Sequence, residues 1–154
     1  MMSGLETLVS SLLVWIATNS GYDTSNIQHP EIQFLTPEEI TAEYYGDMLT
    51  YMPESGIDPR IKALYAPNDG ESGTIYLRFT EDLAEVEEDI ESQEILLHEL
   101  VHHVQWQTGA THDWECKNEG ELEAYALGSE FLKQHAHQDY MLSRRAWAQI
   151  YSKC

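Results

Sequence analysis

The sequence is poor in basic residues. It has 8 Lys and Arg against 27 Asp and Glu, which gives a formal net charge of −19. Proteins bind nucleic acids and anionic membranes through basic surfaces, so this balance argues against both kinds of partner. A strongly acidic surface would attract basic peptides over a distance. An acidic surface can instead increase solubility or adapt a protein to salt, and we favour this explanation over the attraction of basic peptides.

Cysteine and long hydrophobic runs are also scarce. Cys116 and Cys154 could form one disulfide, but two cysteines are too few to indicate an oxidising compartment. The apolar run at residues 8–17 is too short to span a bilayer. Glu6 precedes this run and no Lys or Arg does, so it is a poor signal peptide. We expect a soluble chain without a membrane span, either cytoplasmic or secreted after processing, and of unknown oligomeric state.

The length and composition fit one globular domain covering residues 1–154. A hydrophobic content of 42% is ordinary for a folded protein with one core. Patterning predicts both helices and strands, and hence an α+β fold. Thr36, Pro37 and Glu39 form a helix start with a capping box. The other expected elements are a helix at 5–16, strands at 32–35, 61–65 and 74–79, and a C-terminal helix at about 139–152.

The most informative segment is the HExxH motif at residues 98–102. His98 and His102 lie one turn apart on the same face of a helix, so both imidazoles can reach one ion. Neutral imidazole suits Zn²⁺, and Glu99 is close enough to act on a water at the metal. The alternative is an amphipathic helix with these polar residues in solvent. Aliphatic residues surround the motif, which argues for a buried helix whose polar groups need partners.

The same helix has recognisable ends. Ser92 is a candidate N-cap, and Gly109 is a candidate C-cap. The acidic stretch at residues 81–94 is expected to form a solvated helix face. His103 points about a third of a turn from the motif and is expected to support a ligand or lie at the surface.

The third ligand must come from elsewhere. The extended motif HExxHxxGxxH would need Gly and His where this chain has Gln105 and Thr108. A second helix is expected from about residue 118, with carboxylates at Glu119, Glu121 and Glu123. Only one side of that helix can face the metal, so spacing alone does not choose among the three.

The run at residues 121–127 resembles the glutamate motif of gluzincin-type zinc metallopeptidases, in particular small IrrE/ImmA-type domains. The resemblance implies that Glu121 is the third ligand, with Glu119 as the alternative, and that Ala124 lets the two helices approach. Glu123 would be an ordinary solvated acid. The resemblance also implies a zincin-like fold: a small mixed or antiparallel sheet on the active-site helix, with the glutamate helix and further helices C-terminal to it. An edge strand within residues 61–79 would bind substrate backbone.

The function that follows is zinc-dependent hydrolysis of peptide bonds in a peptide or protein substrate. Glu99 would be the general base, taking the proton of the metal-activated water and passing it to the leaving amine. Tyr125 is our candidate for the additional hydrogen-bond donor, with three histidines as alternatives: His112, His135 and His137. The competing interpretations are a regulatory or binding module with zinc but little general proteolysis, and a structural zinc protein.

Overall fold

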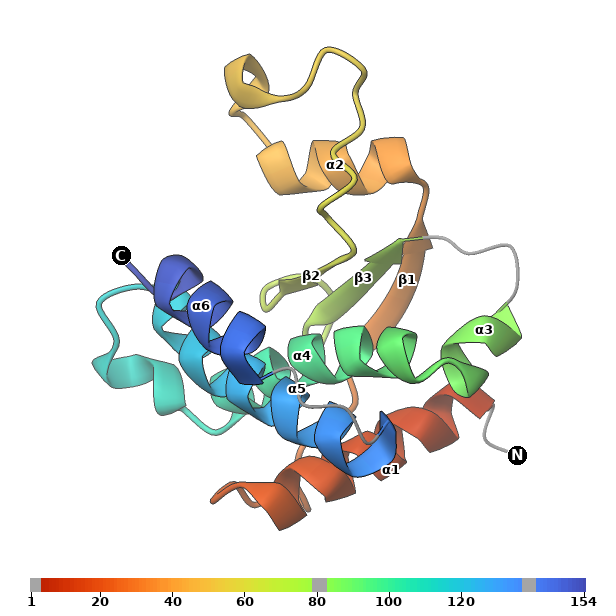
Figure 1. The fold of residues 1–154 in the computed structure, drawn as a ribbon, viewed down its shortest axis with the longest axis vertical. Coiled ribbons are helices and arrows are strands. Elements are labelled where there is room, and N and C mark those ends of the chain that lie inside the picture. Colours follow the sequence, from red (N-terminus) through yellow and green to blue (C-terminus); the bar gives the residue numbers. More distant parts are fainter. Residues whose placement is uncertain (1–3, 79–82, 137–140) are drawn as a thin grey trace.

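The computed structural model describes residues 4–78, 83–136 and 141–154 (Figure 1). It shows the expected α+β fold, in which helices pack around a three-stranded mixed sheet. None of the helices in these ranges has the length and hydropathy needed to cross a membrane. The helices and strands are α1 (Gly4–Asn19), β1 (Glu31–Leu35), α2 (Pro37–Tyr45), β2 (Ala63–Ala66), β3 (Thr74–Arg78), α3 (Leu83–Glu88), α4 (Ile90–Gln107), α5 (Glu121–Ala136) and α6 (Met141–Tyr151). Three short 3₁₀ turns are η1 (Leu49–Tyr51), η2 (Ala110–Asp113) and η3 (Lys117–Gly120).

The central strand of the sheet is β3. On one side β1 runs parallel to it, with Ile32 opposite Ile75, and on the other β2 runs antiparallel, with Leu64 opposite Tyr76. The predicted pairing of the strands at 61–65 and 74–79 is confirmed, although Phe79 lies outside the described residues. Among those residues β2 is an edge strand, because it pairs only with β3.

Alternating side chains of the sheet enter two different cores, as a strand period of two requires. Ile75 and Leu77 belong to the larger core, whereas Tyr76 packs against the smaller one. The larger core contains buried residues of α1 and α4: Val9, Leu12, Leu13, Ile16, Leu96, Leu97, Leu100, Val101 and Val104. The smaller core is formed by Ile40, Tyr45 and Ile61. Helices α4 and α2 therefore lie on opposite faces of the sheet (Figure 1).

Residues 37–62, which we call the α2 lobe, project from the rest of the molecule (Figure 1). The predicted capping box is present: Thr36 accepts a hydrogen bond from the Glu39 N–H, and Glu39 accepts one from the Thr36 N–H. The helix ends before Gly46, whose φ of 53° favours glycine.

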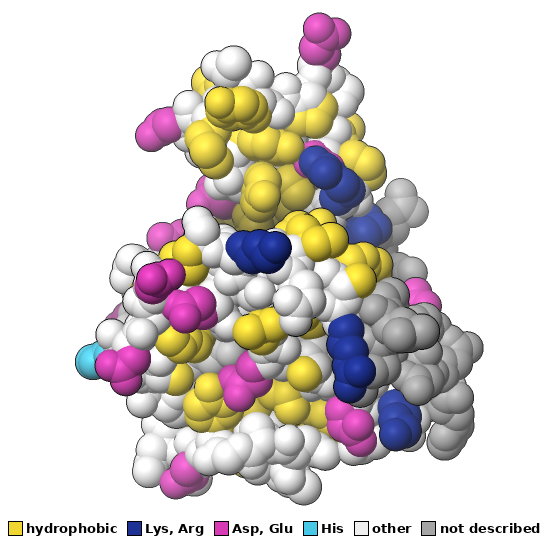
Figure 2. All heavy atoms as spheres, turned by 60° about the vertical axis from the view of Figure 1, so that its left-hand side comes forward, with side chains coloured by type: hydrophobic (Ala, Val, Ile, Leu, Met, Phe, Trp, Pro, Cys, Tyr) yellow, Lys and Arg dark blue, Asp and Glu magenta, His cyan; other side chains and the backbone are white. Residues whose placement is uncertain are grey.

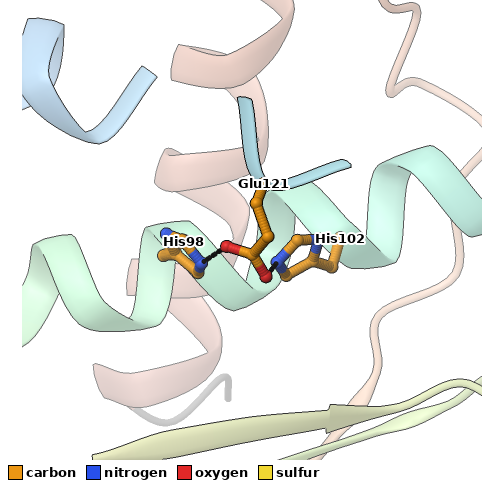
Figure 3. A group of neighbouring side chains, drawn as sticks. All are labelled: His98, His102 and Glu121. Atoms are coloured by element: carbon orange, nitrogen blue, oxygen red, sulfur yellow. Dashed lines mark hydrogen bonds and ion pairs between the residues drawn. The ribbon is translucent and has the colours of Figure 1, made fainter. Parts of the chain in front are cut away.

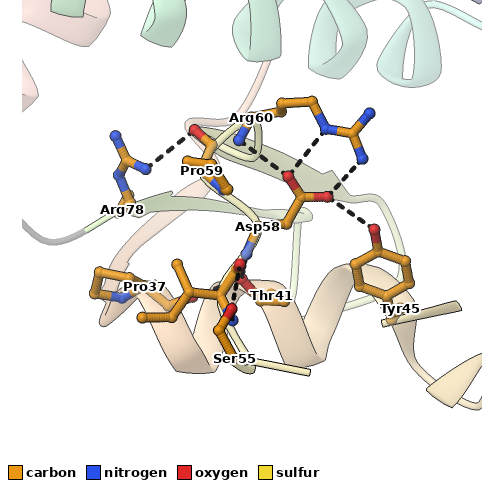
Figure 4. A network of polar contacts seen from close by, with 9 residues as sticks. Pro37, Thr41, Tyr45, Ser55, Asp58, Pro59, Arg60 and Arg78 are labelled. Carbon is orange, nitrogen blue, oxygen red and sulfur yellow. Dashed lines mark hydrogen bonds and ion pairs between the residues drawn. The ribbon is translucent and has the colours of Figure 1, made fainter. Parts of the chain in front are cut away.

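Asp58 ties the returning segment of the lobe to α2 (Figure 4). Its carboxylate is buried and accepts hydrogen bonds from the Tyr45 hydroxyl at 2.8 Å and from two nitrogens of Arg60 at 3.0 and 2.8 Å. Its backbone N–H donates to Thr41 Oγ1 at 3.0 Å. The Arg60 guanidinium in particular holds the pKa of this carboxyl well below its usual range. This satisfied polar network therefore holds the lobe itself together. The small core packs the lobe against the sheet, through Leu35, Leu64 and Tyr76.

The prediction of Ser92 as the N-cap of α4 is wrong, and the predicted acidic face holds only in part. The N-cap is Asp89, which accepts hydrogen bonds from the N–H and the hydroxyl of Ser92, so Ser92 lies within the first turn. The solvated helix face predicted for residues 81–94 is found at Glu87, Glu88 and Glu91, which are exposed, whereas residues 81–82 lie outside the described residues. Glu94 is an exception: it is buried, with its carboxylate 3.5 Å from the guanidinium of Arg144. Arg144 comes from α6, so a local pattern could not reveal this pair. Gly109 follows the C-terminus of α4 with a φ of +78°, as predicted.

A disulfide between Cys116 and Cys154 joins the end of the chain to the loop that precedes α5. The bond closes a loop of 38 residues, which contains all of α5 and α6. It therefore restrains the two C-terminal helices against each other, in addition to their side-chain packing.

Replacing both cysteines by serine is expected to lower the free energy of unfolding by about 3–4 kcal/mol, since the unfolded chain regains the entropy of an open loop of this length. Urea unfolding monitored by circular dichroism measures the change. The wild-type protein under reducing conditions is the control and should match the double variant. A loss below about 1 kcal/mol in both would show that the bond does not restrain the unfolded state.

Candidate metal centre

Two histidines of α4 face the first residue of α5 (Figure 3). Nε2 of His98 lies 3.0 Å from Oε2 of Glu121, and Nε2 of His102 lies 3.0 Å from Oε1 of the same carboxylate. The chain reverses between the helices at Gly109 and through η2 and η3, which returns Glu121 to the histidine pair. The three residues predicted as ligands are therefore brought together.

The geometry of this group fits a metal ion. One ligand atom from each of His98, His102 and Glu121 lies within 4.8 Å of the other two. A tetrahedral zinc ion with bonds of about 2.0–2.2 Å holds its ligand atoms roughly 3.4 Å apart, so small side-chain rotations would suffice. The side chains are 14%, 12% and 22% exposed, which encloses them but leaves access from solvent. Two imidazoles and a carboxylate could hold a divalent cation here.

Protons and charges in the metal-free site are strongly coupled. Burial disfavours the charged form of His102, but its hydrogen bond with Glu121 and the charges of Glu99 and Glu121 outweigh burial and raise the pKa to about 9. Burial likewise raises the pKa of Glu121, yet the hydrogen bonds from both histidines outweigh it and hold the pKa well below its usual range. The carboxylate is therefore ionised and attracts positive charge, whether a proton or a cation.

The metal-free protein is expected to lose stability as the pH rises from about 6.5 to 9. Folded His102 titrates at about 9, against 6.5 in the unfolded chain, so the folded state binds more protons in this window. The contribution of His102 to the free energy of unfolding is complete below pH 6.5 and is lost as the pH passes 9. It can reach about 3 kcal/mol. Unfolding by urea across this range measures it, and the His102→Asn variant should show a smaller slope.

Zinc should reverse this dependence, because only neutral imidazole binds the ion and protons compete less as the pH rises. The stabilisation by zinc should be larger at pH 8 than at pH 6.5. An unchanged slope in the metal-free His102→Asn variant, or equal zinc stabilisation at both values, would contradict the assignment of His102.

Glu99 follows His98 on α4 and interacts electrostatically with the whole triad. Burial is the main cause that raises its pKa, and the negative charge of Glu121 adds to the shift, whereas His98 and His102 oppose it. A carboxyl group with a raised pKa holds and releases a proton more readily near neutral pH. This environment supports the base role predicted for Glu99, which stays a prediction.

Tyr125 lies one turn after Glu121 and packs on a histidine of the triad. The ring centroids of Tyr125 and His98 are 4.6 Å apart. Burial and the charge of Glu121 raise the pKa of the phenol, which therefore keeps its proton. The same ring lies 6.1 Å from the rings of both Trp147 and Tyr151 on α6, which are largely exposed. An aromatic series thus leads from the triad to the surface, and the donor role of Tyr125 stays a prediction.

The alternative residues lie elsewhere. Glu119, the second candidate ligand, accepts hydrogen bonds from the backbone N–H groups of Glu115 and Cys116 and so closes the turn at η3. His112 is exposed in η2. Nδ1 of His135 donates to the Phe131 carbonyl at 3.0 Å, near the far end of α5. His137 lies outside the described residues.

A family model described as Domain of unknown function (DUF6647) matches residues 2–153. The chain belongs to the DUF6647 family. No curated protein and no solved structure was found to match the sequence. The family description carries no activity, so the function of this DUF6647 chain has to be argued from the site itself.

Sequence reasoning missed two polar residues that support the triad in this DUF6647 chain. Gln105 is fully buried, and its Oε1 lies 3.0 Å from Nδ1 of His102. Glu123 was expected to be a solvated acid, and that expectation is wrong: it accepts hydrogen bonds from Gln105 and from the hydroxyl of Tyr22. The sequence does contain a signal for the contact between Gln105 and His102: Gln105 follows His102 by one turn, on the same face of the helix.

His103 is also internal. Its Nδ1 accepts from the Tyr65 hydroxyl at 2.9 Å, and its Nε2 donates to the Gln28 carbonyl at 2.7 Å. Because Tyr65 belongs to β2, this histidine holds the edge strand against the helix that carries the triad. A surface position, one of the two expected for His103, is therefore wrong, because the side chain is fully buried.

Proposed function

We propose that this protein is a zinc-dependent hydrolase of peptide bonds, similar to the gluzincin branch of metallopeptidases. The observation that carries the proposal is the convergence of His98, His102 and Glu121, with Glu99 beside them. Three protein ligands are typical of catalytic zinc sites, whereas structural sites are closed by a fourth. Among the described residues the group has three members. A half-buried carboxyl with a raised pKa next to the group favours hydrolysis over a purely structural role.

Each residue has a specific task in this proposal. His98, His102 and Glu121 would hold the ion, which when bound supplies Lewis-acid activation of a water and of the scissile carbonyl. Glu99 accepts a proton from the attacking water and returns it to the leaving amine. The phenol of Tyr125, whose raised pKa keeps it protonated above neutral pH as well, is the candidate donor to the oxygen that develops negative charge.

The surroundings support an extended polypeptide as the substrate. The edge strand β2 can pair with a further strand, which is a common way of binding an extended peptide. Exposed hydrophobic side chains are also unevenly distributed. Apart from Val14, the large ones among the described residues belong to the α2 lobe or to α4–α6: Tyr44, Met48, Leu49, Tyr51, Trp106, Leu122, Trp147, Ile150 and Tyr151.

Figure 2 shows hydrophobic side chains on the projecting α2 lobe and around the constriction between it and the rest of the molecule. Clusters of exposed apolar side chains typically mark binding surfaces. Substrates with apolar side chains near the scissile bond therefore fit this surface best.

A peptide library of mixed sequence, incubated with zinc-loaded protein and analysed by mass spectrometry, tests the proposal. We expect cleavage enriched at apolar residues, abolished by a chelator and restored by added zinc. A narrow specificity would appear as few cleaved peptides with strong sequence preference. If zinc-loaded protein, folded and stoichiometrically occupied, cleaved no member of the library or of a set of unfolded proteins, hydrolysis of peptides would be ruled out as the general activity.

A further inference from the structure

A chain of hydrogen bonds, most of them partly buried, leads from His102 away from the candidate metal centre. Oε1 of Gln105 lies 3.0 Å from Nδ1 of His102. Nε2 of Gln105 donates to the carbonyl of Gly120 at 3.1 Å and to Oε1 of Glu123 at 3.0 Å. The hydroxyl of Tyr22 donates to the same Glu123 oxygen at 2.6 Å. The chain thus joins α4, the start of α5 and the segment between α1 and β1.

These contacts determine the direction of every hydrogen bond. Two acceptors surround the amide nitrogen of Gln105, so that nitrogen must face them and Oε1 must face His102. An amide oxygen only accepts, so Nδ1 of His102 must carry a hydrogen. In neutral His102 this leaves the lone pair on Nε2, the atom that lies 3.0 Å from Glu121. A flipped amide would instead direct its NH₂ group at His102 and its oxygen at two acceptors.

We propose that Gln105 is a positioning residue that sets the tautomer and ring orientation of His102 for metal binding, and that Glu123 and Tyr22 hold Gln105 in place. We call Gln105, Glu123 and Tyr22 the His102 relay. This inference deepens the proposed function and rests on it. Hydrogen-bonding partners of ligating histidines generally have this effect on metal sites.

Gly120 gives the relay a second connection to the triad. A Cβ atom at this position would collide with Oε1 of Gln105 and with the ring of Trp114. Gln105 can therefore pack against the backbone of residue 120, immediately before Glu121, only because residue 120 is glycine. The relay holds a histidine ligand on one side and the start of the glutamate helix on the other.

Gln105→Leu is expected to weaken zinc binding about 10–100-fold, because the apolar side chain no longer accepts from Nδ1 of His102. Competition with a chromophoric chelator measures the dissociation constant without any assay of cleavage. Gln107→Leu is the matched control. This residue lies two positions away on the same helix, is exposed, and donates to the Ser72 carbonyl at 3.3 Å. The control should bind zinc within about twofold of wild type.

A pair of variants at Glu123 separates positioning from general stability, including the case in which Gln105→Leu fails to fold. Glu123→Gln keeps an oxygen facing the Gln105 amide and should bind zinc nearly as wild type does. Glu123→Leu removes that acceptor, leaves the Gly120 carbonyl as the only group orienting the amide, and should weaken binding. Tyr22→Phe should produce a smaller change of the same sign, since Tyr22 acts only through Glu123.

A second readout concerns the imidazole proton itself. In the zinc-loaded wild type, NMR of the histidine side chains should show a slowly exchanging proton on Nδ1 of His102, and this proton should exchange rapidly in Glu123→Leu. Glu123→Leu could instead lower only the free energy of unfolding and leave the zinc dissociation constant and the exchange of this proton unchanged. That result would contradict the positioning role of the His102 relay, whereas the proposed function would stand. If the wild-type protein bound no zinc, that result would contradict both the positioning role of the relay and the proposed function.

Discussion

Glu99→Gln is expected to lower kcat for peptide cleavage by about 10²–10⁴-fold while leaving zinc bound, because an amide cannot accept the proton of the attacking water. The substitution keeps the shape of the side chain and removes only its basicity. Its burial and raised pKa place Glu99 in an environment suited to this task. Single-turnover cleavage of a preferred peptide, with zinc content measured on the same sample, separates the loss of chemistry from the loss of metal.

The control for this experiment is Glu91→Gln. Glu91 is an exposed glutamate in the first turn of the same helix, so its neutralisation changes the net charge equally but lies at the surface. The control should retain wild-type kcat. A Glu99→Gln variant that cleaved at more than a tenth of the wild-type rate would show that another group acts as the base.

Glu121→Ala is expected to weaken zinc binding roughly a hundredfold or more. Zinc-finger sites with four ligands release about 10–16 kcal/mol on binding, so one ligand out of three carries a substantial part of the binding free energy. The structure adds a second effect. Without the carboxylate, His98 and His102 lose the partner to which both Nε2 atoms point at 3.0 Å. Isothermal titration with zinc measures the change directly.

Glu119→Ala is the comparison that decides between the two glutamates. The Glu119 carboxylate closes a turn through backbone N–H groups, so its loss should reduce stability slightly and leave the zinc dissociation constant almost unchanged. If instead Glu119→Ala lost zinc and Glu121→Ala did not, the carboxylate assigned to the ion would be the wrong one.

The sequence alone could predict the parts of this molecule that depend on local patterns. The HExxH spacing places two imidazoles on one helix face whatever the rest of the fold does. The capping box at Thr36 and the glycine at the end of α4 act within one turn of chain, and both are present. The antiparallel pairing of β2 with β3 follows from two short alternating segments joined by a turn.

The errors concern contacts between segments far apart in the sequence. Glu94 is buried because Arg144 arrives from α6, and Glu123 is half-buried because Tyr22 and Gln105 converge on it. A helical acid looks solvated until the tertiary partner is known. In the sequence Gln105 indicates only that the extended zinc motif is absent, because spacing on one helix does not show that Gly120 and Glu123 supply two acceptors for its amide. In the same way, no pattern of two isolated cysteines could predict the disulfide that the structure contains.

The proposed function depends on a three-ligand metal site with one coordination position left for a water. A crystal structure of the zinc-loaded protein, with anomalous data collected at the zinc edge, tests it most directly. We expect one strong peak bonded to Nε2 of His98, Nε2 of His102 and a carboxylate oxygen of Glu121, with a water completing the site. No peak among these side chains at full zinc occupancy, or a fourth protein side chain bonded to the ion, would contradict it.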